Sequence, residues 1–140
     1  MSSQQADPEL VGHSRFMQVL GVHFEEIAAE RVLGWFDSGP QHHQPFGLVH
    51  GGVFSAVIET FASVGGYQAV KDDGRLAVGV TNVTDFLRPH RQGRLRVVAE
   101  ALLQGRTQQL WQVVITRVED GKTVARGQVR MQNVSTPGER

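Results

Sequence analysis

The sequence of 140 residues contains no cysteine. This absence excludes a disulfide-stabilised scaffold, a zinc or iron–sulfur site built from cysteine ligands, and a cysteine nucleophile. The sequence also lacks an excess of charge of either sign, because its 14 basic and 14 acidic residues cancel. A neutral chain argues against general binding to nucleic acids or membrane surfaces, although it is compatible with a local basic patch.

Long hydrophobic runs are missing as well. No apolar stretch approaches the roughly 20 residues of a membrane span, and the beginning of the chain, with Asp7 and Glu9, lacks the apolar segment of a signal peptide. The composition, 40% hydrophobic and 20% charged, supports a buried core and excludes an intrinsically disordered chain. We therefore expect a cytoplasmic protein with a single domain over residues 1–140 and a core spanning about residues 22–134.

The first part of the chain predicts one helix and two strands. Asp7 and Pro8 are typical of a helix start, and Gly21 is typical of a helix end. Two short segments with imperfect alternation of apolar and polar residues follow, at 22–27 and 31–37. We expect these segments to form strands joined by a turn.

The middle of the chain predicts a long helix over residues 50–70. Its apolar side chains point in nearly every direction around a helical wheel, and a helix of that kind must be buried on most of its sides. In so small a protein, we expect a sheet to wrap around this helix. The polar segment 71–74 ends it.

The second half predicts strands rich in Val, Leu and Thr. They lie at 76–87, 95–103, 110–118 and 123–133. The connections between them are short and of the hairpin type, so we expect sequential strands to pair in antiparallel fashion. Residues 135–140 are expected to form a frayed tail. The predicted fold class is α+β, with one long buried helix against an antiparallel sheet.

A lone carboxylate, Glu59, interrupts the apolar helix. Such a group is costly in a dry setting unless it is paired, so Glu59 either lies on a narrow polar stripe, forms a salt bridge to a partner strand, or has a functional role. Ser63 follows four residues later and shares its helix face. His50, Gly51 and Gly52 open the helix, where bare backbone N–H groups can hold a developing oxyanion. Close packing or a tight turn is the alternative explanation of the two glycines.

The segment Gln44-Pro-Phe-Gly-Leu-Val-His50-Gly-Gly, followed by Glu59 and Ser63, resembles the hotdog-fold acyl-CoA thioesterases of the PaaI-like group. The branch most similar contains 4-hydroxybenzoyl-CoA thioesterase of the Arthrobacter type and the thioesterases of the menaquinone and enterobactin pathways. The likeness extends from about residue 23 to residue 134. It implies a long helix wrapped by an antiparallel sheet.

The resemblance also implies roles for the site residues. Glu59 would be the catalytic carboxylate, and the Gly51 N–H would polarise the thioester carbonyl. Gln44 and His50 would help to hold the carbonyl or the sulfur end, and Ser63 would position water or the leaving acid. Whether Glu59 attacks the carbonyl or activates water stays open at this point.

Helix geometry predicts a dimer. Gly51 and Glu59 are eight residues apart in sequence, which places them about 12 Å apart along one helix at 1.5 Å per residue. A reacting carbonyl must lie within about 3–3.5 Å of its nucleophile. One carbonyl therefore requires Gly51 from one chain and Glu59 from another. The resembling family similarly has sites at dimer interfaces, often in a tetramer of two dimers.

Coenzyme A carries phosphates that Arg side chains and backbone N–H groups bind well. The resemblance places nucleotide contacts in two loops, which we expect at adjoining sheet ends, and the candidates are Arg88, Arg106 and Thr107. Ordinary solvated arginines are the alternative reading. Phe54 and Phe61 are expected to line the acyl site.

Other chemistries are disfavoured by spacing. The adjacent His42 and His43 do not form a metal-ligand pattern, and the sequence contains neither a Gly-x-Ser-x-Gly elbow nor a phosphate-binding loop. The sequence predicts an acyl-CoA thioesterase that needs no metal or other cofactor, with coenzyme A as part of the substrate. The Glu59 pattern argues against a hotdog dehydratase, whereas a non-catalytic acyl-CoA-binding hotdog protein remains the alternative.

Overall fold

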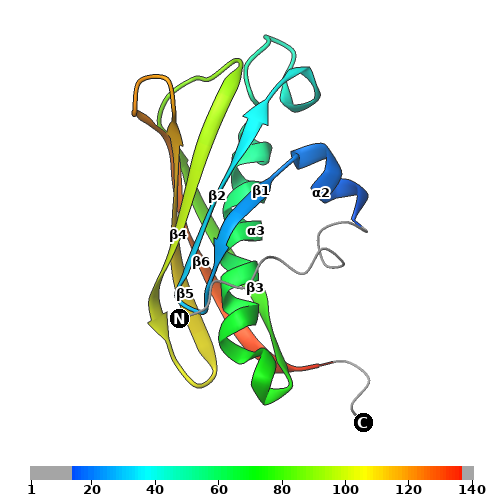
Figure 1. Ribbon diagram of the computed structural model, residues 1–140, viewed down its shortest axis with the longest axis vertical. Helices are drawn as coiled ribbons and strands as arrows, with labels where there is room; N and C mark the ends of the chain where they lie inside the picture. Colours follow the sequence, from blue (N-terminus) through cyan, green and yellow to red (C-terminus); the bar gives the residue numbers. More distant parts are fainter. Residues whose placement is uncertain (1–13, 137–140) are drawn as a thin grey trace.

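The computed structural model describes residues 14–136, in which one long helix packs against a six-stranded antiparallel sheet (Figure 1). In chain order the elements are α2 (Arg15–Leu20), β1 (His23–Ile27), β2 (Arg31–Ser38), a 3-10 turn (Pro40–His42), α3 (Gly51–Val70), a second 3-10 turn (Lys71–Asp73), β3 (Arg75–Phe86), β4 (Gly93–Gln104), β5 (Gln108–Arg117) and β6 (Thr123–Ser135). These bounds confirm the predicted central helix and all six predicted strands.

Both helices begin and end at residues suited to those positions. Ser14 caps α2 by accepting a hydrogen bond from the Met17 N–H, and Gly21 ends it at a φ of 68°. The predicted end at Gly21 is therefore confirmed, whereas the predicted start at Asp7 and Pro8 lies outside the described residues. His50 caps the start of α3, and the chain after Lys71–Asp73 leaves the helical direction through Gly74 at a φ of 67°.

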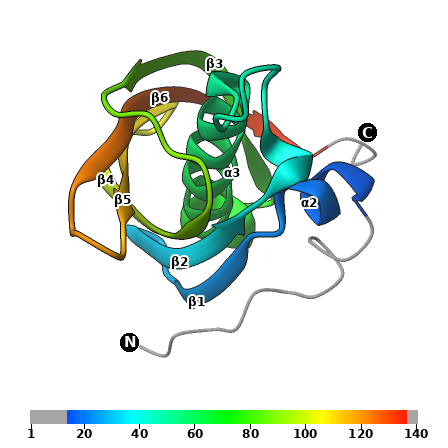
Figure 2. The same cartoon turned by 90° about the horizontal axis from the view of Figure 1, so that it is seen from above.

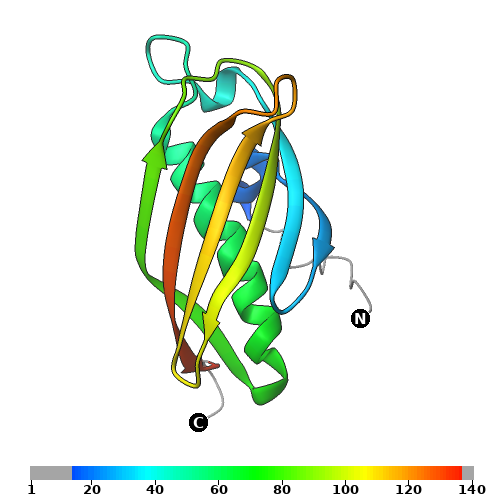
Figure 3. The same cartoon turned by 90° about the vertical axis from the view of Figure 1, so that its left-hand side faces the viewer.

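The strands are ordered β1-β2-β4-β5-β6-β3, from the blue edge to the green edge in Figure 3. The predicted hairpin between β3 and β4 is wrong, because β3 pairs with β6 along its length, from Arg75 opposite Ser135 to Phe86 opposite Ala125. The sheet curls around α3 (Figure 2), so the segment between β3 and β4 connects two strands that are not neighbours in the sheet. Ser135 belongs to β6 and not to the predicted tail; residues 137–140 lie outside the described part.

The core lies between the concave face of the sheet and one face of α3. Strand β6 alternates as predicted, with Ala125, Val129 and Met131 buried and its arginines outward. Gly65 of α3 lies so close to the fully buried Trp111 ring that no Cβ fits between them. The sheet does not surround α3, however. The face opposite the core is left partly open to solvent, and this face carries Glu59.

Candidate active site

Gln44 lies in a tight loop at the end of the molecule where α3 begins. The loop is closed by a β-bridge between His43 and Val49 and turns at Gly47, which has a φ of 79°. The Oε1 atom of Gln44 accepts hydrogen bonds from the N–H groups of Phe46 and Leu48. Because the oxygen is occupied by the loop, the amide N–H groups of Gln44 remain to donate to a ligand.

The start of α3 lies beside Gln44. The Nδ1 atom of His50 accepts a hydrogen bond of 2.7 Å from the Gly52 N–H, so His50 acts as the helix cap. Among residues 14–136, the Gly51 N–H has no hydrogen-bond partner, and it sits at the positive end of the helix dipole. A Cβ on Gly51 would lie 3.0 Å from the Phe86 ring, so a side chain here would crowd the site.

One hollow of about 300 Å³ is lined by Gln44 and Gly51, two of the residues predicted to hold the carbonyl, whereas the third, His50, does not line it. Gln44, Gly51, Phe54 and Arg88 all line it. The Nη1 atom of Arg88 donates a hydrogen bond of 2.7 Å to the carbonyl oxygen of Thr123. This bond holds the guanidinium group at the rim of the hollow. The structure therefore brings together four of the predicted site residues.

Glu59 lies in a second hollow of about 420 Å³, together with Ser63. Its side chain is exposed to solvent in the single chain, although Phe16 and Met17 of α2 line the same hollow. The carboxyl group rests on strand β3: a Cβ on Gly79 would lie 3.5 Å from the Glu59 Cδ atom. Ser55 and Asn82, which the sequence did not single out, line the same hollow.

The two hollows have no lining residue in common. Gly51 and Glu59 belong to one continuous helix, Gly51–Val70, so their separation along its axis is about 12 Å. The described chain thus divides the predicted site into a carbonyl-holding half with Gln44 and Gly51 and a carboxylate half with Glu59 and Ser63. Neither half can serve the other within one chain.

The two predicted acyl-lining residues have different positions. Phe54 lines the first hollow, with its ring 6.5 Å from that of Phe86. Phe61 is fully buried against Phe24 at a ring distance of 4.7 Å and lines neither hollow, so its role in lining the acyl site stays a prediction. The physical reason is helical: two residues turn the helix by about 200°, which places Phe61 opposite the face of Glu59.

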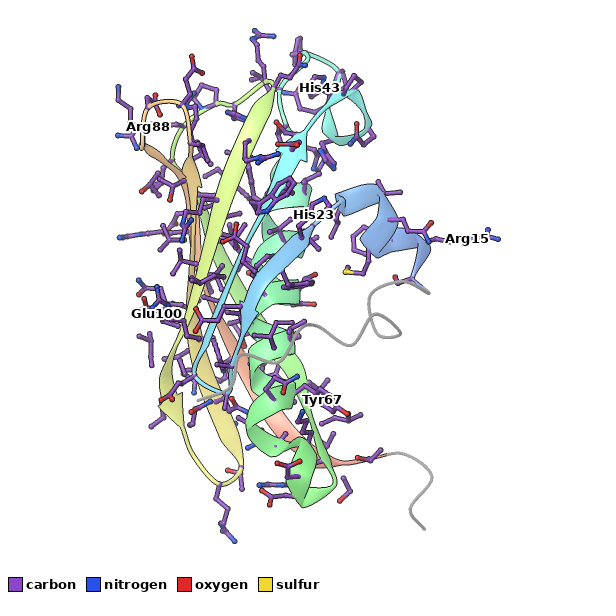
Figure 4. All side chains as sticks on the ribbon, in the orientation of Figure 1. Arg15, His23, His43, Tyr67, Arg88 and Glu100 are labelled. Atoms are coloured by element: carbon purple, nitrogen blue, oxygen red, sulfur yellow. The ribbon has the colours of Figure 1, made fainter. Side chains whose placement is uncertain are left out.

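The two predicted coenzyme loops do not adjoin within one chain. Arg88 precedes β4, whereas Arg106 and Thr107 follow it, and 12 residues of strand separate the loops by about 40 Å. Figure 4 shows Arg88 at the same end as His43 and far from Tyr67 near the other end of α3. The expectation of adjoining loops is wrong, because the loops before and after one strand lie at its opposite ends whichever strands pair.

Histidines near the site are structural. His42 is buried, with its Nε2 atom 2.8 Å from the carbonyl oxygen of Val19. Burial lowers the pKa of His90, whose main-chain carbonyl accepts a hydrogen bond from the Val49 N–H and thereby fixes the Gln44 loop. Within residues 14–136, no group of three His, Asp or Glu side chains could hold a metal ion, and no helix is long and apolar enough to cross a membrane.

Comparisons with known proteins show the family to which the chain belongs. The sequence model of the thioesterase superfamily matches residues 46–124. The chain is 42% identical over 121 residues to Rv1847 of Mycobacterium tuberculosis, which is named as a candidate esterase, and 85% of this chain and 86% of the relative are covered. It is 34% identical over 96 residues to the proofreading thioesterase EntH of Cronobacter turicensis, with 69% of each chain covered.

Solved structures show the same fold. The structure of the Mycobacterium tuberculosis protein matches with a TM-score of 0.83 at 41% identity, covering 88% of this chain and 98% of that chain. The thioesterase HI1161 of Haemophilus influenzae matches in fold with a TM-score of 0.87 at 23% identity, covering 100% of this chain and 96% of that chain. A long helix against a six-stranded antiparallel sheet is the hotdog fold of thioesterases. The chain belongs to the thioesterase superfamily, which supports hydrolysis of acyl thioesters as its general activity.

Proposed function

We propose that this protein hydrolyses an acyl- or aroyl-CoA thioester to the free acid and coenzyme A, at a site shared between two chains. The observation that carries the proposal is the division of the site into two separate hollows along one helix, one at Gly51 and the other at Glu59. A carbonyl held by Gln44 and Gly51 is out of reach of Glu59 in the same chain. A second copy in the antiparallel direction brings its own Glu59 to that carbonyl.

The residues of the combined site have separable tasks. The free amide N–H groups of Gln44 and the Gly51 N–H donate hydrogen bonds to the thioester carbonyl oxygen, whose negative charge grows in the transition state. Glu59 of the partner subunit then either attacks the carbonyl carbon or removes a proton from an attacking water. In both cases the C–S bond breaks and coenzyme A leaves as the thiolate, which takes up a proton; after direct attack, water hydrolyses the resulting anhydride to the free acid. Ser63 lies one helical turn beyond Glu59 and positions that water or the departing acid.

The exposed edge of the sheet supports a dimer. Strand β3 pairs with β6 on one side and has no strand on its other side among the described residues. It exposes large apolar side chains, including Val78, Val80 and Val83 at 46%, 55% and 60%. An open edge with apolar side chains favours pairing with another strand, and two copies of β3 can pair about a two-fold axis. Pairing of two dimers into a tetramer and a cytoplasmic location complete the proposal.

The same dimer explains the separated coenzyme loops. In an antiparallel pair, the end of one chain that carries Arg88 faces the end of the other chain that carries Arg106 and Thr107. We therefore assign the coenzyme phosphates to Arg88 of one chain and to Arg106 and Thr107 of the partner subunit. The main chain at Thr107 is already fixed, because its carbonyl oxygen accepts a hydrogen bond from the Asn133 N–H.

The activity is tested by thiol release from benzoyl-, hydroxynaphthoyl- and fatty acyl-CoA. Glu59→Gln should lower kcat by about 100-fold or more, since a neutral amide neither attacks nor takes a proton. Glu100→Gln, an exposed carboxylate on the outer face of β4, is the matched control and should leave kcat unchanged. Binding of acyl-CoA without thiol release by the unaltered protein would favour the alternative, a non-catalytic acyl-CoA-binding protein.

A further inference from the structure

Asn82 of strand β3 connects the edge of the sheet to helix α3. Its Nδ2 atom donates a hydrogen bond of 3.0 Å to the main-chain carbonyl oxygen of Ser55. Strand β3 is paired on one side with β6. The hydrogen bond from the Asn82 side chain to α3 is therefore a second, independent attachment of this strand. Neither the residue roles assigned above nor the packing of the core uses this amide.

The bonded carbonyl belongs to the helical turn that carries the proposed catalytic carboxylate. In an α-helix each N–H donates to the carbonyl four residues earlier, so the Glu59 N–H also points to the Ser55 oxygen. Asn82 thus fixes the turn from which the Glu59 side chain emerges. Gly79, three residues before Asn82 on the same strand, supports the Glu59 carboxyl group. One strand therefore contacts both the helical turn that precedes Glu59 and the end of the Glu59 side chain.

The sheet ladder alone does not fix β3 at this point. The register between β3 and β6 shifts between Gly79 and Thr81, directly before Asn82. A bulge of this kind bends the strand and leaves one residue unpaired. The segment that supports the Glu59 carboxyl group therefore needs another contact to hold its distance from α3, and the Asn82 hydrogen bond lies immediately after the bulge.

Thr84 determines which way the Asn82 amide faces. Its Oγ1 atom donates a hydrogen bond of 2.7 Å to the Asn82 Oδ1 atom. Because the oxygen is held on the strand side, the NH2 group faces the helix. Both hydrogen bonds are partly buried, so water competes with them less than at the surface. Thr84, Asn82 and the Ser55 carbonyl form one relay from strand to helix.

We propose that Asn82 is a positioning residue, which holds strand β3 against the α3 turn that carries Glu59 and so keeps the carboxylate in its reactive place. This inference rests on the proposed function of Glu59. Since a shift of about 1 Å at a reacting group can cost about 100-fold in rate, we expect loss of the relay to lower kcat and leave KM nearly unchanged.

The test compares four variants with the unaltered protein on the acyl-CoA that it hydrolyses best. Asn82→Asp keeps the shape and removes the donor, and it should lower kcat by about 10- to 100-fold with KM changed by less than about 3-fold. Thr84→Val removes the orienting hydroxyl and should lower kcat by less than Asn82→Asp does. Thr84→Ser keeps a hydroxyl and should have nearly the kcat of the unaltered protein. Thr81→Val makes the same substitution on the exposed outer face of β3 and should have no effect.

Each other outcome overturns the proposal in a recognisable way. If Asn82→Asp has the kcat of the unaltered protein and Glu59→Gln is inactive, Asn82 has no positioning role and the proposed function still holds. A rise in KM with kcat preserved makes Asn82 a substrate contact instead. If Asn82→Asp does not fold, the Thr84 pair decides, and equal kcat values for Thr84→Val and Thr84→Ser overturn the relay. Full activity of Glu59→Gln overturns the proposed function itself, and this inference with it.

Discussion

At the scale of single residues, the site illustrates how one side chain can have its polar atoms divided between structure and ligand. The Gln44 oxygen and the His50 Nδ1 atom are both occupied by main-chain N–H groups of the loop and the helix start. Their bonds shape the loop, and the N–H groups left over, on Gln44 and Gly51, face the hollow. Gln44 therefore both shapes the loop and keeps free N–H donors.

Arg88 should serve the coenzyme more than the chemistry. Arg88→Ala should raise KM by up to about 10-fold, the effect of one lost charge-assisted contact, with kcat little changed. The defect should shrink on a pantetheine thioester, which lacks the nucleotide. Arg126→Ala, on the outer face of β6, is the matched control. Equal defects of Arg88→Ala on both thioesters would show that this side chain does not touch the nucleotide.

His90 should make the protein less stable in mild acid. Its side chain is 4% exposed, and burial lowers its pKa from the ordinary value of 6.5. The unfolded chain therefore binds a proton at a higher pH than the folded protein. The contribution of neutral His90 to stability is complete above about pH 6.5 and is lost as the pH falls towards the lower folded pKa.

Urea unfolding of the unaltered protein and of His90→Gln at pH 7 and pH 5 measures this effect. The free energy of unfolding should fall more steeply towards pH 5 in the unaltered protein, because Gln does not titrate. Asp37, whose pKa is lowered by its hydrogen bond to Arg94, titrates below its ordinary value of 3.8 and does not act in this range. Identical slopes for the two proteins would contradict the assignment to His90.

At the scale of elements, the contact between α3 and β5 depends on a glycine. Gly65→Ala would raise helix propensity, yet the added Cβ would collide with the buried Trp111 ring. Because rings in a packed core yield little, we expect a loss of about 1–3 kcal/mol in the free energy of unfolding. Trp111→Phe should reduce this loss in a double-mutant cycle. A stabilising Gly65→Ala would show that the ring moves freely.

Sequence periodicity predicts the helices and strands of this protein better than it predicts which strands pair. The alternation of Ala125, Val129 and Met131 and the closing Gly21 depend on neighbouring residues, so they can be seen in the sequence. The pairing of β3 with β6 depends on how the whole sheet curls, and no local pattern carries that information.

Within the site, the likeness of the Gln44 to Ser63 segment identified the residues of both halves, and helix geometry predicted their separation. Phe61 lies in the core because an apolar residue close to Glu59 in sequence need not share its helix face. The sequence gives no signal for Asn82, because its proposed role depends on a contact with Ser55, 27 positions away. Simple alternation along 75–86 does not predict this placement, because the bulge between Gly79 and Thr81 interrupts it.

At the scale of the whole molecule, one chain holds two incomplete halves of a site and an open apolar strand edge. The proposed dimer would explain all three features: the separation of Gly51 from Glu59, the exposed valines of β3, and the proposed coenzyme loops at opposite ends of β4. An isologous dimer would create two equal sites, each combining the Gln44 loop of one chain with Glu59 of the other.

Complementation between two inactive variants tests this claim most directly. In a mixed dimer of Glu59→Gln and Gln44→Ala chains, both changes fall in one site and the other site is unaltered. Co-refolding equal amounts gives half mixed dimers, so thiol release should recover to about a quarter of the unaltered activity. With subunit exchange confirmed, activity no higher than the average of the two parents would contradict the shared site and show that each chain holds a complete site of its own.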